Sequence, residues 1–152
     1  MTTTDDIVLR PAVSFAFLQV LPLILFSLTF LLLAWYLSPY FIFFSIPVCA
    51  AAGYRMWYIR SMQYLISREY IRLTRGLLFK RVDQLEMYRI KDFIITQPFS
   101  LQLLRLMNLT LKSTDTENAV ITFHGIPFSE ITDTIRERVQ EARHGNNIYE
   151  IN

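Results

Sequence analysis

The hydrophobic pattern of the chain is dominated by one uninterrupted apolar stretch, which runs from Pro11 to Tyr54. None of its 44 residues is Asp, Glu, Lys, Arg or His. A single continuous helix of this length would measure roughly 66 Å, whereas the hydrocarbon core of a bilayer is about 30 Å thick. The stretch therefore fits two membrane crossings better than one.

The turn between the two crossings is predicted at Tyr36–Tyr40, because Pro39 disfavours helix at the residue before it. The two helices are then expected over about residues 13–37 and 39–59, which places a transmembrane hairpin at residues 11–60. Aromatic residues mark both expected headgroup levels, as in the interfacial belts of membrane proteins. They are Trp35, Tyr36 and Tyr40 at the far level, and Trp57, Tyr58 and Tyr64 at the near level.

Short alternating runs replace the continuous apolar pattern after the hairpin, and runs of period two are typical of strands. Gly76 interrupts them at a position that suits the positive φ of a hairpin turn. Residues 99–106 are expected to form a short helical turn or a loop with buried leucines. Strands are predicted at residues 63–67, 70–75, 77–82, 86–90, 92–96 (which continues the strand before it or forms another), 109–113 and 119–123, the last being ended by Gly125-Ile126-Pro127.

A helix is predicted over about residues 129–143, because apolar residues recur there at spacings of three and four. Strands followed by one helix predict an α+β domain over residues 61–145, in which the helix buries its apolar stripe against the sheet. Residues 1–10 are expected to be a polar lead-in and residues 146–152 a loose tail. The stripe consists of Phe128, Ile131, Ile135, Val139 and Ala142.

The net charge of +2 conceals an uneven distribution along the chain. Counting Lys and Arg against Asp and Glu, residues 55–91 carry +6, residues 92–152 carry −3 and residues 1–10 carry −1. The positive charge directly follows the second helix, whereas the turn of the hairpin is uncharged. Under the positive-inside rule, this asymmetry predicts a multi-pass protein of a prokaryotic cytoplasmic membrane with both termini in the cytoplasm.

The basic residues that follow the hairpin form a first candidate site. Their simplest role is to set the topology and to attract anionic headgroups, which contributes about 1 kcal/mol for each residue near the surface. A sharper hypothesis is a specific site for an anionic headgroup on the first strands and their loops. The candidate residues are Arg55, Arg60, Arg68, Arg72, Arg75, Lys80 and Arg81.

A line of small residues on the second helix forms a second candidate site. Ser45, Cys49 and Gly53 follow one another at four-residue intervals. Such a small-xxx-small face lets another helix approach closely inside a membrane. The partner is either the first helix of the same hairpin or a helix of a second subunit, and the sequence leaves both open.

The sequence gives no support to an enzymatic function. The four glycines form no phosphate-binding loop, and the two histidines have no metal-ligand spacing. Cys49 is the single cysteine, so it cannot form a disulfide within the chain. The apolar stretch from Pro11 to Tyr54 has no acidic, basic or histidine residue that could relay protons. We therefore expect no enzyme, no cofactor, no metal site, no small-molecule substrate and no nucleic-acid binding.

The segment from Tyr64 to Asp115 resembles a known family. It reads YLISREYIRLTRGLLFKRVDQLEMYRIKDFIITQPFSLQLLRLMNLTLKSTD. The resemblance rests on Thr74-Arg75-Gly76-Leu77-Leu78, on Tyr88-Arg89-Ile90-Lys91-Asp92, and on Gln97 with the leucine-rich turn that follows it. Over roughly residues 60–143 the chain is similar to the bacterial pleckstrin-homology-like (PH-like) domain of small membrane proteins, in which a pair of transmembrane helices often precedes the domain.

The resemblance implies a seven-stranded, partly open antiparallel barrel of PH-like fold that is capped by a C-terminal helix. It brings no catalytic residues and no established ligand. One departure is Met107-Asn108, which stands where the family usually has a glycine-containing segment. Because Asn tolerates the left-handed backbone, the turn is expected to survive there.

The function predicted from these features is that of a non-catalytic, membrane-anchored scaffold or assembly subunit. It would bind protein partners or copies of itself through the PH-like domain and through helix packing, with membrane lipids around it. One alternative is a lipid-sensing module that binds anionic headgroups. Another is an accessory subunit of a membrane transport or secretion complex.

Overall fold

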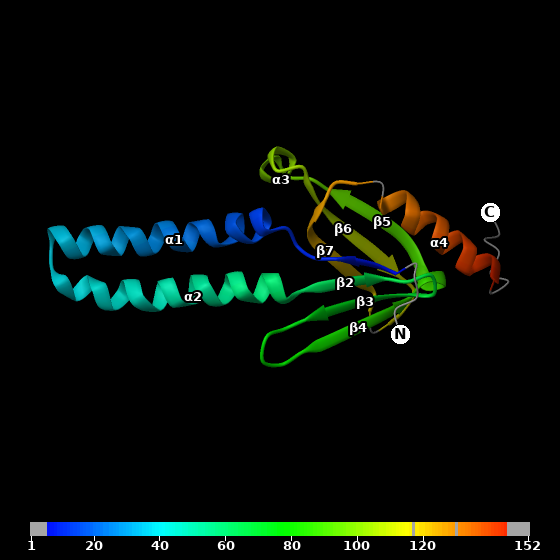
Figure 1. The fold of residues 1–152 in the computed structure, drawn as a ribbon, viewed down its shortest axis with the longest axis horizontal. Helices are drawn as coiled ribbons and strands as arrows, with labels where there is room; N and C mark the ends of the chain where they lie inside the picture. The colour runs from blue at the N-terminus through cyan, green and yellow to red at the C-terminus, as the bar shows by residue number, and fades with distance from the viewer. Residues whose placement is uncertain (1–5, 117, 130, 146–152) are drawn as a thin grey trace.

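A computed structural model of the chain describes residues 6–116, 118–129 and 131–145, so the expected tail lies outside the described residues. Two long helices project side by side from a domain of two antiparallel sheets and a C-terminal helix (Figure 1). The helices are α1 (Val13–Tyr36) and α2 (Ile42–Ser61), joined through the short 3₁₀ turn η1 (Pro39–Phe41). Both predicted helices are confirmed, with ends that differ from the prediction by at most three residues.

The two long helices have the length and apolarity needed to cross a membrane. They pack along a seam in which Ser45, Ala52 and Ile59 of α2 are buried at seven-residue intervals. In this seam the hydroxyls of Ser27 and Ser45 lie 2.9 Å apart, within hydrogen-bond distance. A seven-residue interval is close to two helical turns, so these side chains keep facing α1 over the whole length of α2.

The domain consists of a four-stranded sheet and a three-stranded sheet. The first has the order β1-β2-β3-β4 and the second the order β5-β6-β7, with every neighbouring pair antiparallel. The strands are β1 (Ile7–Leu9), β2 (Gln63–Ile66), β3 (Tyr70–Arg75), β4 (Arg81–Glu86), β5 (Ile90–Thr96), β6 (Leu106–Ser113) and β7 (Val120–Pro127). The remaining elements are η2 (Met87–Arg89), α3 (Phe99–Leu103) and α4 (Ile131–Gly145).

The first strand comes from the segment that was expected to be a polar lead-in. Ile7 and Leu9 pack against the core, and β1 pairs with β2. The hairpin is therefore inserted between two adjacent strands of one sheet. Since β1 precedes α1 and β2 follows α2, both strands must lie on the same side of any membrane that the hairpin crosses.

Four predicted strand boundaries were wrong. Residues 77–80 form a loop after Gly76 (φ 114°), and β4 begins only at Arg81, opposite Arg75. Strand β6 begins at Leu106, three residues before its predicted start. Residues 86–90 are interrupted by η2, one turn of 3₁₀ helix. The last strand does not stop before Gly125 but continues to its end at Pro127, with an irregular register opposite Met107–Leu109 that is typical of a β-bulge.

The main core lies between the two sheets and α4. Tyr64 stacks on Phe123 at its centre, with ring centroids 4.5 Å apart. Ile135 is only 1% exposed, and Ile131 and Val139 of the same stripe are also buried, which confirms the predicted face of α4. Phe128 was wrongly included in that stripe, because it precedes the helix and is 60% exposed.

A second core joins the hairpin to the domain. It buries Phe15, Ala16 and Ile59 of the helices against Leu101 and Leu106 of the domain. Helix α1 therefore packs in one core with α3 and β6, and the connecting chain is not its sole attachment to the domain.

Gly125 makes the contact between α1 and β7 possible. Its carbonyl accepts a 2.9 Å hydrogen bond from the backbone N–H of Ala12. Its φ is +59°, and a Cβ added to it would lie 2.1 Å from Cγ of Phe15. A side chain at this position would therefore be strained and would collide with the first turn of α1.

The two sheets and the capping helix match the architecture of a PH-like fold. No backbone ladder joins the two sheets within the described ranges, so they remain open sheets and do not close into a barrel. The left-handed residue near the leucine-rich turn is Arg105 (φ 53°) and not Asn108. Asn108 instead accepts a 2.9 Å hydrogen bond on its side-chain oxygen from the N–H of Gly125.

Candidate functional site

The structure divides the predicted line of small residues between two surfaces of α2. Ser45 is buried against α1, whereas Cys49 and Gly53 are exposed. A four-residue step advances by about 40° beyond a full turn, so the line drifts away from the seam that the seven-residue spacing follows. No atom lies within 4 Å of a Cβ built on Gly53. The three residues therefore do not form one helix-packing face within the chain.

The seven predicted basic residues do not gather on one surface either. Arg75 and Arg81 flank the β3–β4 loop, and each contacts a different carboxylate oxygen of Asp83 at 2.7 Å. The Asp83 carboxylate is almost completely buried. Two cations of the set are therefore partly neutralised within the fold, where they brace the base of this loop.

Two other cations of the set have polar neighbours, one on strand β3 and one in the β2–β3 turn. Arg72 donates to the side-chain oxygen of Gln84 at 3.2 Å, and its guanidinium lies 5.1 Å from the ring centroid of Tyr70. Arg68 occupies the β2–β3 turn, which Figure 1 shows at the end of the sheet away from the hairpin. It lines a hollow together with Glu69, Glu86 and Glu141. An anionic headgroup would meet several carboxylates at this hollow.

The remaining three basic residues lie at the hairpin end of the domain. Arg60 and Lys80 are exposed. Arg55 donates to the side-chain oxygen of Gln19 at 3.3 Å and lines an apolar groove of about 530 Å³ between the two helices and His124. Partial burial lowers the pKa of His124. Any contact of these cations with headgroups depends on the hairpin crossing a membrane.

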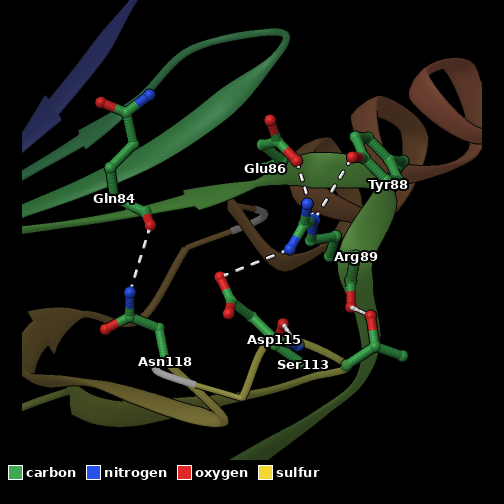
Figure 2. A network of polar contacts seen from close by, with 8 residues as sticks. Gln84, Glu86, Tyr88, Arg89, Ser113, Asp115 and Asn118 are labelled. Carbon is green, nitrogen blue, oxygen red and sulfur yellow. Dashed lines mark hydrogen bonds and ion pairs between the residues drawn. The ribbon is translucent and has the colours of Figure 1, made fainter.

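A polar network around Arg89 was not foreseen from the sequence. Figure 2 shows Arg89 between Glu86, Tyr88 and Asp115, with Nε of Arg89 2.8 Å from Oε2 of Glu86 and Nη1 of Arg89 3.8 Å from Oδ2 of Asp115. Its Nε also donates to the hydroxyl of Tyr88 at 3.3 Å. These bonds raise the pKa of Arg89, so the guanidinium stays protonated. The network joins the segment after β4 to the β6–β7 loop and is best explained as a structural clamp.

The most distinctive open surface of the domain is a groove of about 650 Å³ between β5 and α4. Phe93 and Ile95 line it from the strand, and the guanidinium of Arg136 lies 5.3 Å from the centroid of the Phe93 ring. Phe128 borders its other end and is exposed. The groove is therefore apolar along its floor and carries polar groups from α4 at its edge. We call it the β5–α4 groove.

The strand that borders this groove is an edge strand. Within the described ranges β5 pairs only with β6, so every second peptide group of β5 points away from the sheet. Ile94 and Ile95 are both exposed although they point to opposite faces of the strand. The run Phe93-Ile94-Ile95 could have indicated this edge from the sequence. It places apolar side chains on both faces of one strand, and a domain of this size cannot bury both faces.

Comparison with known families agrees with this architecture. The family model for the bacterial PH domain matches residues 12–143, a range that includes both long helices and strands β2 to β7. No curated protein and no solved structure matches the chain. The match covers well over half of the chain, and the fold consists of two antiparallel sheets and a C-terminal helix. The chain therefore belongs to the bacterial PH domain family.

Proposed function

We propose that the protein is a non-catalytic, membrane-anchored assembly subunit whose PH-like domain binds an extended segment of another protein chain at the β5–α4 groove. That chain is a separate protein or a second copy of the same protein. The hairpin provides the anchor, and the domain provides the binding surface.

The anchoring part of the proposal is supported by the hairpin and by the charges that follow it. Both helices are long and apolar enough to span a bilayer. The pairing of β1 with β2 requires residues 7–9 and 63–66 to lie on the same side. The excess of cations in residues 55–91 favours the cytoplasmic side of a prokaryotic cytoplasmic membrane.

The single observation that carries the binding part is the exposed apolar edge of β5. An edge strand offers free N–H and C=O groups to a further strand, and soluble proteins usually protect such edges. Here the edge instead carries exposed Ile94 and Ile95 and adjoins an apolar groove. An added strand would gain main-chain hydrogen bonds from β5 and would place alternate side chains in the groove, which is a known mode of peptide recognition.

The test is site-specific photocross-linking of the full chain in its native membrane. A photoreactive amino acid at Ile94 should give one discrete protein adduct, because the side chain lies on the proposed binding edge. The same amino acid at Glu141, which is exposed on α4 but outside the β5–α4 groove, is the control. Loss of the Ile94 adduct in the Ile95→Lys variant, together with an unchanged adduct in the Thr96→Lys variant, would support binding at the groove.

Lack of a protein adduct at Ile94 would contradict the proposal. The lipid-sensing alternative then becomes the leading hypothesis. It would be examined by binding of the full chain to anionic lipids in nanodiscs.

A further inference from the structure

Two exposed apolar elements lie at the hairpin end of the domain. The first is the loop between β3 and β4, where Leu78 is 87% and Phe79 is 92% exposed. The second is α3, where Phe99 is 82% and Leu103 is 76% exposed. Figure 1 shows both beside the near ends of α1 and α2, on opposite sides of the hairpin. We call each of these two pairs of exposed residues an apolar foot: Leu78 and Phe79 form the first, and Phe99 and Leu103 form the second.

The loop that carries the first foot is held in a defined conformation. Gly76 has a φ of +114°, and a Cβ added to it would lie 1.9 Å from the carbonyl oxygen of Phe79. At the base of the loop, Asp83 contacts both Arg75 and Arg81 at 2.7 Å. The loop therefore has a defined conformation, and this conformation leaves Leu78 and Phe79 exposed.

The second foot is fixed to the base of the hairpin. Leu101 is buried in the core that joins α3 to the helices, and Leu104 packs against the same core. Phe99 and Leu103 lie on the opposite side of this short helix and are left exposed. Because the hairpin, α3 and β6 share one core, this foot cannot move independently of the membrane anchor.

The length of the hairpin places both feet at the level of the membrane surface. Helix α1 has 24 residues, which gives about 36 Å against a hydrocarbon thickness of about 30 Å. With the exposed Trp35 and Tyr36 at the far interface, the near helix ends lie in the headgroup layer. Exposed Trp57 of α2 marks the same near layer.

We propose that the apolar feet insert into the near interface of the membrane that the hairpin crosses, and that they fix the orientation of the PH-like domain on that surface. This inference rests on the proposed membrane anchoring. A bilayer fits the feet better than a protein partner does, because they adjoin the hairpin and because Lys80 follows the apolar tip where phosphates would lie. Helix α4 lies toward the far end of the domain from the hairpin and stays accessible from the cytoplasm (Figure 1).

The experiment places an environment-sensitive fluorophore at single cysteines of the full chain in liposomes that contain lipids with a spin label near the headgroup and lipids with a spin label on the acyl chain. Phe79→Cys and Leu103→Cys, each made in a Cys49→Ser background, report on the two feet. The natural Cys49 is exposed on α2 and reports on the hairpin. Glu141→Cys, made in the same Cys49→Ser background, reports on the far end of α4 and serves as the water-exposed control.

The proposal predicts a blue shift and strong quenching by the labelled lipids at positions 79, 103 and 49, with neither effect at position 141. Quenching at position 49 without quenching at both feet would overturn the inference and leave the anchoring intact. Lack of quenching at position 49 would overturn both. Equal quenching at position 141 would also overturn the inference, because the domain would then lie on the membrane without a defined orientation.

Discussion

Replacing Gly125 by alanine should weaken the connection between the hairpin and the domain. The backbone of Gly125 has a φ of +59°, and the new Cβ would lie 2.1 Å from Cγ of Phe15. Phe15 is buried in the core at the base of the hairpin and cannot turn away without leaving a cavity. The substitution therefore combines backbone strain with overpacking.

The expected loss can be estimated from these two effects. A left-handed conformation costs an alanine roughly 1–2 kcal/mol, and an extra methyl group in a packed core costs about 1–3 kcal/mol. We expect Gly125→Ala to lower the free energy of unfolding by about 2–5 kcal/mol. That is a large fraction of the roughly 5–15 kcal/mol that stabilises an ordinary domain.

The assay is a denaturant titration of the full chain in mild detergent, followed by tryptophan fluorescence. Phe15→Ala alone should cost about 3–5 kcal/mol. The double variant should lose about 1–3 kcal/mol less than the sum of the single variants, because removing the ring makes room for the new methyl group. Gly53→Ala is the matched control, since that glycine is helical and has no atom near its Cβ position. It should leave stability unchanged or raise it by up to about 1 kcal/mol.

Additivity of Gly125→Ala and Phe15→Ala to within about 0.5 kcal/mol would refute the reasoning, because distant and independent sites behave in that way. The hairpin would then be linked to the domain by the chain alone, and the shared core would not exist in the protein in solution.

Three further predictions follow from the fold. Ile135→Asp would bury an unpaired carboxylate and should cost several kcal/mol in a thermal melt, whereas the exposed Glu137→Asp should change the melting temperature little; equal melting temperatures would show that α4 is not packed on the sheets. Burial lowers the pKa of His124 below 6.5, so the folded state binds fewer protons there than the unfolded chain and stability should fall as the pH drops below 6.5. His124→Gln should lessen this loss below pH 6.5, and an unchanged pH profile would exclude a contribution of the histidine. A topology reporter fused after Asn152 should report a cytoplasmic position and one inserted at Ser38 an external position; the reverse result would overturn the predicted orientation.

Much of this fold was predictable because its strongest signals are local. The uncharged stretch and Pro39 predicted both helices to within three residues at each end, and β3 matched its predicted bounds of Tyr70 and Arg75. The β3–β4 loop was misplaced because Leu77, Leu78 and Phe79 have the composition of a strand, although they form an exposed loop. Composition alone does not distinguish exposed apolar side chains from buried ones.

The candidate sites were predicted less well because they depend on tertiary contacts. The spacing of Ser45, Cys49 and Gly53 gave no means of knowing that only the first faces α1. The cations of the β3–β4 loop were found, but their neutralisation by Asp83 follows from the antiparallel register. Strand β1 was missed because three residues carry too little pattern, and its pairing partner lies beyond the whole hairpin.

The central claim, that this protein is an assembly subunit acting through the β5–α4 groove, is tested most directly by the mass of the purified full chain. Light scattering in mild detergent would give the protein mass for the wild type beside Ile95→Lys and the neighbouring control Thr96→Lys. We predict a wild-type particle heavier than the 17.9 kDa of one chain. Ile95→Lys, which places a charge in the groove, should reduce it to one chain, and Thr96→Lys should leave it unchanged. A wild-type mass of one chain with no co-purifying protein would contradict the claim, and an assembly that survives Ile95→Lys would contradict the groove as its site.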